Sequence, residues 1–362
     1  MNLKKKLLAL GLSLALTLSL TACGQKAAEP EQPEEPAQTE EPAVEAPDGT
    51  EADTAHFRIA ALKGPTAMGL VKLMKDNDET IGALLSSAKP YEGEVGNLYT
   101  FTLAGSADEV TPALIKGDLD MACVPANLAA VLYGKTNGAV EVLAVNTLGV
   151  LYIVENGDAV QSMADLKGQT IVAAGKGSTP EYALRYLLTE NGIDPDNDVT
   201  IDWKSEHSEC VAALASGQAT IALLPQPFVT VAQSKIEGLR MALDLNAEWD
   251  ALGNGSGLIT GVIVARREVV EENPAAVNEF LKEYAASVDW VNTNTADAAA
   301  LIGEYGIVDA AVAEKALPYC NIVCLTGDEM QAKLSGYLQV LYDAESASVG
   351  GALPESDFYF VG

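Results

Sequence analysis

Histidine is nearly absent from this chain, which has only His56 and His207 among its 362 residues. The five cysteines do not have the spacing of zinc ligands, so we expect no metal site. The sequence contains neither a Gly-x-Ser-x-Gly nucleophile elbow nor a phosphate-binding glycine loop. These absences argue against metal-dependent and nucleophilic catalysis, and we expect no cofactor.

Basic residues are also scarce. Lys and Arg number 22 against 51 Asp and Glu, which gives a formal net charge of −29. Because an acidic chain repels nucleic acids and anionic membrane surfaces, we exclude nucleic acid as a partner. Apolar residues make up 48% of the chain, so it can still bury a sizeable core.

An apolar run over Leu7–Leu20 follows three lysines at positions 4–6. The run is shorter than the ~20 residues that span a bilayer, and small residues follow it. This pattern is typical of an export signal, which we place at 1–22. The segment Leu20-Thr21-Ala22-Cys23-Gly24 resembles a bacterial lipobox, in which the cysteine is lipidated. An ordinary signal peptide with a chance cysteine is the alternative.

Residues 23–54 are rich in Glu, Pro, Ala and Gln and lack any apolar periodicity. We expect a disordered, extended tether after the lipidated Cys23. Two acyl chains, such as palmitate, would anchor the protein stably, whereas one chain binds only marginally. We therefore expect a body that works outside the cytoplasm at a membrane, and the long acidic tether favours a Gram-positive cell surface.

The remaining cysteines fall in apolar surroundings. Cys123 lies in an apolar strand and Cys210 on the apolar side of a helix, so we expect both to be small buried hydrophobic residues. Cys320 and Cys324 are four residues apart, which would place them on one face of a helix. Whether they form a disulfide is left open.

Short apolar strands alternate with amphipathic helices from Phe57 onward. A helix that begins at Pro65 carries the apolar residues from Met68 to Met74. Such alternation predicts βαβ units and a mostly parallel sheet. We expect strands at 57–62, 98–103, 120–124 and 140–145, and a second set at 170–174, 199–203 and 219–224.

The last third has few strands. Residues 258–264 are strand-like, and helices follow from Pro274 to about Tyr342. The simplest organisation is an α/β fold of two lobes, in which the chain leaves lobe 1 near 150 and returns near 260. Lobe 1 is then 55–150 plus 260–362, and lobe 2 is 151–259. Two crossover strands would form a hinge with a cleft between the lobes.

Several short motifs occur in a characteristic order. They are Ala60-Ala61-Leu62-Lys63-Gly64-Pro65-Thr66, Asp165-Leu166-Lys167-Gly168-Gln169-Thr170-Ile171, Gly177-Ser178-Thr179-Pro180, Gly192-Ile193-Asp194, Leu214-Ala215-Ser216-Gly217-Gln218-Ala219, Leu224-Pro225-Gln226-Pro227, Gly261-Val262-Ile263-Val264 and Glu272-Asn273-Pro274. Over 57–362 the chain resembles substrate-binding lipoproteins of ABC importers, in the branch that binds alkanesulfonates, taurine, nitrate and thiamine precursors. The resemblance implies a type II periplasmic-binding-protein fold that closes over a small solute and delivers it to a permease.

In open α/β sheets, ligands bind beyond the carboxyl ends of the strands, where loops lead into helices. Helix N-termini there present unpaired N–H groups that suit anionic groups. The loops of both lobes provide the candidate ligand-binding residues, which are Lys63, Gly64, Thr66, Asn127, Asn146, Gly177, Ser178, Thr179 and Gln226, with Thr147 as a further wall residue.

Each assignment has a structural alternative. Ser178, Thr179 and Asn127 could simply cap helices, and Lys63 could be a solvated surface lysine. Trp249 lies in a loop-like stretch and could stack on a flat solute ring, although surface packing is the simpler interpretation.

We expect a monomer that binds a small polar or anionic solute and has an ABC permease as its partner. A thiamine-pyrimidine-synthase-like enzyme is the alternative of another class, but its active-site histidine and cysteine-rich motif have no counterpart here. A solute-sensing lipoprotein receptor is the third possibility, because it would bind and close in the same way.

Overall fold

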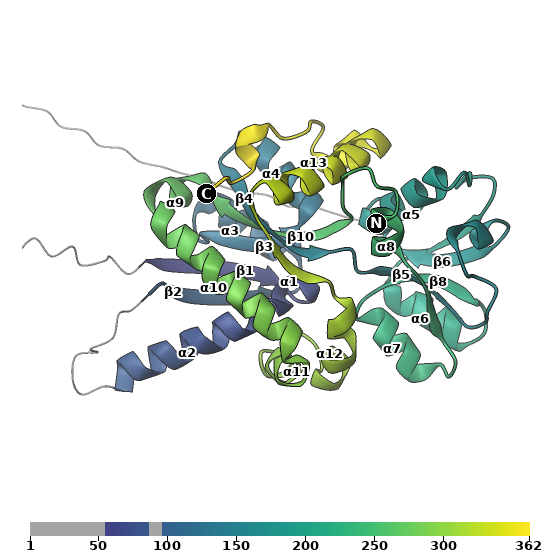
Figure 1. Cartoon of the computed structure of the whole chain (residues 1–362), viewed down its shortest axis with the longest axis horizontal. Coiled ribbons are helices and arrows are strands. Elements are labelled where there is room, and N and C mark those ends of the chain that lie inside the picture. Colours follow the sequence, from purple (N-terminus) through teal and green to yellow (C-terminus); the bar gives the residue numbers. More distant parts are fainter. Residues whose placement is uncertain (1–54, 87–95) are drawn as a thin grey trace, which may run out of the picture. The chain divides into compact units, whose positions relative to one another are not determined.

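The computed structural model describes residues 55–86 and 96–362 (Figure 1). The expected export signal 1–22, the lipidation site Cys23 and the tether 23–54 lie outside the described residues. Within the described ranges, no helix is both long enough and apolar enough to cross a membrane.

Sheet A has six strands among the described residues, in the order β11-β4-β10-β3-β1-β2. The strands are β1 (His56–Leu62), β2 (Leu98–Ala104), β3 (Met121–Pro125), β4 (Val140–Leu148), β10 (Ile259–Arg266) and β11 (Ile322–Leu325). β1 is parallel to β2 and β3, whereas β10 is antiparallel to β3 and β4. Sheet A and its helices form lobe 1.

Sheet B has five strands in the described part of the chain, in the order β7-β6-β8-β5-β9. They are β5 (Leu151–Glu155), β6 (Thr170–Ala174), β7 (Thr200–Lys204), β8 (Ile221–Pro225) and β9 (Arg240–Asp244). β6 is parallel to β7 and β8, and β5 is antiparallel to β8 and β9. Sheet B and its helices form lobe 2.

The expectation of mostly parallel sheets is wrong, since both sheets are mixed. β1, β3, β6 and β8 end at the boundary between the lobes. β5 and β10 are the strands by which the chain enters lobe 2 and returns to lobe 1, so they begin at that boundary and run in the opposite direction. Two crossings between the lobes thus account for the antiparallel pairs made by β5 and β10.

Helices flank the sheets (Figure 1). Those of lobe 1 are α1 (Pro65–Met68), α2 (Val71–Ser86), α3 (Ala107–Lys116), α4 (Ala126–Lys135), α9 (Arg267–Glu272), α10 (Pro274–Thr293), α11 (Thr295–Glu304), α12 (Ala310–Ala316) and α13 (Gly327–Ala344). Those of lobe 2 are α5 (Thr179–Glu190), α6 (His207–Ala215), α7 (Phe228–Lys235) and α8 (Leu245–Asp250). Short 3-10 turns cover Met163–Leu166, Leu317–Tyr319, Ser346–Val349 and Ser356–Phe358.

Apolar side chains form layers on both faces of each sheet. One face of sheet A packs against α2, α10 and α11, and the other packs against α3, α4 and α13. The second layer continues into lobe 2 beneath α5 and α8, while α6 and α7 cover the other face of sheet B. This continuity ties the two lobes through a shared apolar layer.

The two crossover segments touch each other. A Cβ on Gly149 would lie 2.7 Å from the Leu258 side chain, so only glycine fits where the first crossover passes the second. The Gly149 amide donates to Asn246 Oδ1 (3.1 Å), and its carbonyl accepts from Asn321 Nδ2 (2.5 Å). The hinge region is therefore held by side chains from both lobes.

Three local expectations need correction. The helix that begins at Pro65 does not continue to Met74 but is divided at Gly69, where a Cβ would lie 2.6 Å from Tyr284 Oη. Cys324 lies in β11 and Cys320 just before it, so they do not share a helix, and both are free thiols. The stretch before Trp249 is helix α8 rather than a loop.

Trp249 itself is fully buried, so neither solute stacking nor surface packing describes it. Its indole Nε1 donates to Ser256 Oγ (2.8 Å), and its ring packs on those of Tyr186 and Tyr337. The predicted burial of Cys123 and Cys210 is confirmed.

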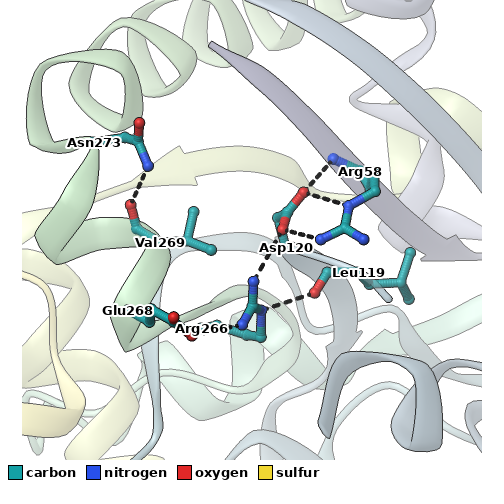
Figure 2. A network of polar contacts seen from close by, with 7 residues as sticks. All are labelled: Arg58, Leu119, Asp120, Arg266, Glu268, Val269 and Asn273. Atoms are coloured by element: carbon teal, nitrogen blue, oxygen red, sulfur yellow. Dashed lines mark hydrogen bonds and ion pairs between the residues drawn. The ribbon is translucent and has the colours of Figure 1, made fainter. Parts of the chain in front are cut away.

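An ion-pair network joins three strands at the ends that point away from the lobe boundary. Figure 2 shows the Asp120 carboxylate between the guanidinium groups of Arg58 and Arg266. Asp120 also accepts from the Arg58 backbone N–H (2.8 Å). Burial alone would raise the pKa of Asp120, but the hydrogen bonds from both arginines outweigh it and keep the pKa below its usual range. The network fixes β1, β3 and β10 relative to one another.

Candidate functional site

Loops from both lobes converge at the lobe boundary. β8 ends with Pro225 opposite Leu151, the first residue of β5, and β3 ends with Pro125 opposite Gly261 near the start of β10. Strands parallel to β3 and β8 end at the same place. The loops after β1, β3, β6, β7 and β8 therefore all lie where a solute between the lobes would be reached.

The loop after β1 turns sharply into α1. Gly64 has a φ of +129°, a conformation that suits glycine, and Pro65 begins the helix. Lys63 is exposed. Thr66 is buried, and its hydroxyl donates back to the Leu62 carbonyl at 3.0 Å. The hydroxyl of Thr66 therefore already has an acceptor within the protein.

Thr66 and Asn146 are brought together by the fold. Asn146 Nδ2 donates to the Thr66 carbonyl (3.1 Å), and Thr147 Oγ1 donates to Asn146 Oδ1 (3.0 Å). A Cβ on Gly261 would lie 2.5 Å from both Asn146 Oδ1 and the Thr66 methyl group, so β10 requires glycine here. These residues form a buried polar cluster at the boundary edge of lobe 1.

Asn127 lies in the first turn of α4 and is half-buried. Its Nδ2 donates to the Ser348 carbonyl (3.2 Å), so the side chain ties α4 to the C-terminal segment. The prediction that Asn127 could cap its own helix is wrong. Pro125 is the N-cap residue of α4, and the Asn127 side chain hydrogen-bonds to Ser348 outside the helix. Its proposed contact with a solute stays a prediction.

The loop after β6 leads into α5. Ser178 is the N-cap residue, but its hydroxyl donates backward to the Gly175 carbonyl (2.6 Å) instead of capping the helix. The Gly177 amide donates to Glu181 Oε2 (2.7 Å). Thr179 Oγ1 accepts from Tyr337 Oη of lobe 1 at 3.2 Å. In the first turn of α5, Pro180 has no N–H, and the Glu181 amide donates to the Ser178 carbonyl at 3.0 Å.

Gln226 follows β8 and is 2% exposed. Its backbone N–H donates to the Val150 carbonyl of the first crossover (2.9 Å), and its Oε1 accepts from the Thr230 hydroxyl (2.9 Å). Its Nε2 is buried with no hydrogen-bond partner among the described residues. A buried donor left in this state costs about 1–3 kcal/mol, so a missing partner is indicated.

His207 carries a second buried side-chain nitrogen without a hydrogen-bond partner among the described residues. The sequence gives no direct indication that this residue has a role in binding. It is the first residue of α6, in the loop after β7, and its ring packs on Phe228 with centroids 5.3 Å apart. Its Nδ1 is buried and has no partner within the described ranges. Burial lowers the pKa of His207, which favours the neutral imidazole. Its position after a parallel strand of lobe 2 is the signal that could have identified it.

The site can thus offer hydrogen bonds but few charges. Two side-chain nitrogens, His207 Nδ1 and Gln226 Nε2, belong to the segments that follow β7 and β8, the two strands that flank β6 in sheet B. Over the described residues, no group of three or more His, Cys, Asp or Glu side chains could hold a metal ion. Such a site can bind a polar or anionic group without changing it covalently.

A two-lobed α/β fold with polar loops converging between its lobes is typical of solute-binding proteins. Residues 92–316 match the protein family described as "ABC transporter, phosphonate, periplasmic substrate-binding protein". The chain belongs to this family, whose members bind solutes for ABC transporters. The predicted resemblance to ABC substrate-binding proteins is therefore confirmed, and the description of the matching family names phosphonate.

The chain is also similar to individual known proteins. A binding protein of Brucella abortus (strain 2308) is 27% identical over 237 residues, which cover 64% of this chain and 70% of that protein. An ABC transporter structure from Parabacteroides distasonis matches with a TM-score of 0.67 and 22% identity, over 85% of this chain and 99% of the other. The aliphatic sulphonate binding protein SsuA of Escherichia coli matches with a TM-score of 0.63 and 17% identity, over 84% and 96%. These two structures confirm the two-lobed fold.

Proposed function

We propose that this protein captures a small solute bearing a phosphonate or sulfonate group and delivers it to an ABC permease. The observation that carries this choice is the pair of buried side-chain nitrogens, His207 Nδ1 and Gln226 Nε2, that have no partner among the described residues. Both can donate to an oxygen. An oxyanion has enough acceptor lone pairs to satisfy both nitrogens.

Neutral donors suit this class of solute. Lys63 and Lys176 are exposed, so we do not assign a buried cation to the site. The family description names phosphonate, and the E. coli neighbour is named for aliphatic sulphonate. Both groups are tetrahedral oxyanions, and the donors that bind one suit the other.

Isothermal titration calorimetry with methylphosphonate, methanesulfonate, nitrate, acetate and a pyrimidine tests the solute class. We expect one tetrahedral oxyanion to bind with 1:1 stoichiometry. Gln226→Glu should weaken oxyanion binding at least tenfold because it places a carboxylate against the anion. Gln233→Glu, on the following helix α7, should leave the affinity unchanged. Tight binding of the pyrimidine with no oxyanion binding would contradict the proposal.

A matched histidine pair gives a second test. His207→Phe keeps the ring that packs on Phe228 but removes the nitrogen, whereas His56→Phe changes a histidine that bonds Thr100 at the other end of β1. Only the first should weaken binding. Because protonation of His207 would add a positive charge, affinity for methanesulfonate, which stays ionised throughout, should rise as the pH falls through the pKa of His207, which burial lowers. His207→Phe should abolish that rise.

The other proposed contacts are Lys63, Gly64, Thr66, Asn127, Asn146, Gly177, Ser178 and Thr179. The hydroxyls of Thr66 and Ser178 already have acceptors in the protein, so their alanine variants should weaken binding less than Gln226→Glu. We place lobe 1 at 55–150 plus 260–362 and lobe 2 at 151–259. Solute should bring these lobes together and lower the radius of gyration measured by X-ray scattering.

We also propose that the protein is a monomer anchored through a lipidated Cys23 on the outside of a Gram-positive cell membrane. The support is the lipobox-like sequence before Cys23 and the acidic tether after it. In cells, Cys23→Ala should abolish incorporation of a palmitate analogue and release the protein from the membrane fraction. Unchanged labelling and fractionation would refute the anchor without affecting the solute proposal.

A further inference from the structure

A groove of about 580 Å³ lies between α5 of lobe 2 and the C-terminal half of α13. This volume is within the range of small-molecule sites, ~300–1,000 Å³. α13 packs against α4 in lobe 1 and also reaches α5 (Figure 1). The groove therefore has one wall from each lobe. The lining residues that matter for its chemistry are Glu181, Tyr182, Arg185, Tyr186, Asp343 and Glu345.

Two tyrosines one helical turn apart form the aromatic wall of the groove. Tyr186 is held in place because its ring packs on the buried Trp249, with centroids 4.6 Å apart. Its hydroxyl also accepts a hydrogen bond from Asn254 Nδ2 (2.8 Å). Tyr182 lines the same groove one turn earlier on α5. The Tyr186 half of the wall is thus preorganised.

Carboxylates surround this aromatic wall. Glu181 accepts from the Gly177 amide (2.7 Å), and Asp343 accepts from Gln339 Nε2 (2.8 Å). Burial and the nearby carboxylates of Glu345 and Glu181 raise the pKa of the Tyr182 hydroxyl, which places those charges close to the ring. The groove is therefore electronegative.

The basic residue in the lining does not offset this charge. Both terminal nitrogens of Arg185 donate to the Asp196 carboxylate, each at 2.9 Å. An anion entering the groove would meet three carboxylates and a guanidinium that is already paired. This charge pattern excludes the oxyanion proposed for the lobe boundary.

We propose that this groove is a second ligand site, which binds a small organic cation such as a quaternary ammonium compound. The faces of Tyr182 and Tyr186 provide cation–π attraction, and the carboxylates of Glu181, Asp343 and Glu345 provide the counter-charge. Because the two walls come from different lobes, a bound cation stabilises the arrangement in which α5 and α13 are adjacent. Tyr337 and Thr179 already join these helices by a hydrogen bond.

Choline is a suitable probe, with binding to the full chain measured by calorimetry and by tryptophan fluorescence, since Trp249 lies directly behind Tyr186. We expect saturable 1:1 binding in the micromolar to millimolar range. Tyr182→Leu and Glu345→Gln should each weaken it at least fivefold. The matched changes Tyr305→Leu and Glu314→Gln, on α11–α12 and away from the groove, should leave it unchanged.

Gly177 lines this groove and is also a proposed solute contact, but Tyr182, Asp343 and Glu345 are not part of the proposed oxyanion site, and the test distinguishes the two sites. Choline should still bind in Gln226→Glu, and methylphosphonate should not compete with it. Competition between the two probes, or binding that Tyr182→Leu and Glu345→Gln leave unchanged, would overturn the proposal. So would the absence of saturable choline binding up to 10 mM. If no oxyanion binds at all, choline binding still tests this groove by itself.

Discussion

Removing the Asp120 carboxylate should destabilise lobe 1 without affecting solute binding. Asp120 is 8% exposed at its side chain and accepts from Arg58 Nε (2.9 Å), Arg58 Nη2 (2.6 Å) and Arg266 Nη2 (3.2 Å). Losing one partner of a buried ion pair costs ~3–5 kcal/mol. The Arg58 side chain is 40% exposed, so water compensates part of the loss. We therefore expect Asp120→Ala to lower the free energy of unfolding by about 2 kcal/mol.

The assay is urea-induced unfolding at pH 7 and at pH 3, with Asp118→Asn as the control. Asp118 is an exposed neighbour, so Asp118→Asn should change the free energy of unfolding by no more than about 0.5 kcal/mol. The pKa of Asp120 is lowered on folding, so its contribution is complete above the unfolded value of ~3.9 and is lost as the pH falls through the folded value. The difference between the wild type and Asp120→Ala should therefore shrink in acid.

A difference that stays constant or grows between pH 7 and pH 3 would refute this reasoning. So would equal effects of Asp118→Asn and Asp120→Ala. Because Arg58, Asp120 and Arg266 lie at the strand ends away from the lobe boundary, the affinity of the folded variant for its solute should match that of the wild type. A loss of affinity would mean that the network acts on the site through the sheet.

Three further predictions concern single positions. Gly149→Ala should lower stability by about 1–3 kcal/mol in thermal unfolding because its Cβ would press on the second crossover, whereas Gly134→Ala in open space on α4 should be neutral or stabilising by up to about 1 kcal/mol. Asp244→Ala removes the oxygen that accepts from two amides at the start of α8, and urea unfolding should show a loss of about 1 kcal/mol. Burial raises the pKa of the Cys324 thiol to about 11, so it should react with a thiol reagent at least tenfold more slowly in the native protein than in the urea-unfolded chain, with labelling of the Cys324 peptide followed by mass spectrometry because the other cysteines are also thiols.

The sequence predicts the two-lobed α/β organisation because its evidence is local. Apolar runs, glycines after helices and prolines such as Pro65 and Pro274 at helix starts are all read within a few residues. The sequence does not predict β11, because a strand of four residues is too short to show alternation of apolar and polar residues. The sequence does not predict α8, because Asp244 is as typical of a loop as of the helix N-cap that the structure shows it to be. Local sequence also does not predict the direction of each strand, because that direction depends on where each crossover segment enters the sheet of the other lobe.

The candidate site shows a different limit. The pattern of loops correctly placed polar residues at the ends of strands, but it could not tell which polar atoms the protein itself satisfies. Thr66, Ser178 and Asn127 have internal partners, whereas His207 Nδ1 and Gln226 Nε2 do not among the described residues. Whether a group is paired depends on contacts between distant segments, which no local pattern contains.

This division of paired and unpaired groups also suggests an order of events under the proposed function. The polar cluster of Thr66, Asn146 and Thr147 in lobe 1 is already hydrogen-bonded internally, so it gains little from an arriving anion. The unpaired nitrogens of His207 and Gln226 belong to lobe 2, and they gain the most, because each is relieved of a desolvation cost of about 1–3 kcal/mol. The solute should therefore bind first to lobe 2, and lobe 1 should close over it afterwards. NMR titration with the oxyanion tests this order. Large changes in backbone amide chemical shift near Asn146, with none near His207, would show that the anion binds chiefly to lobe 1 and would contradict it.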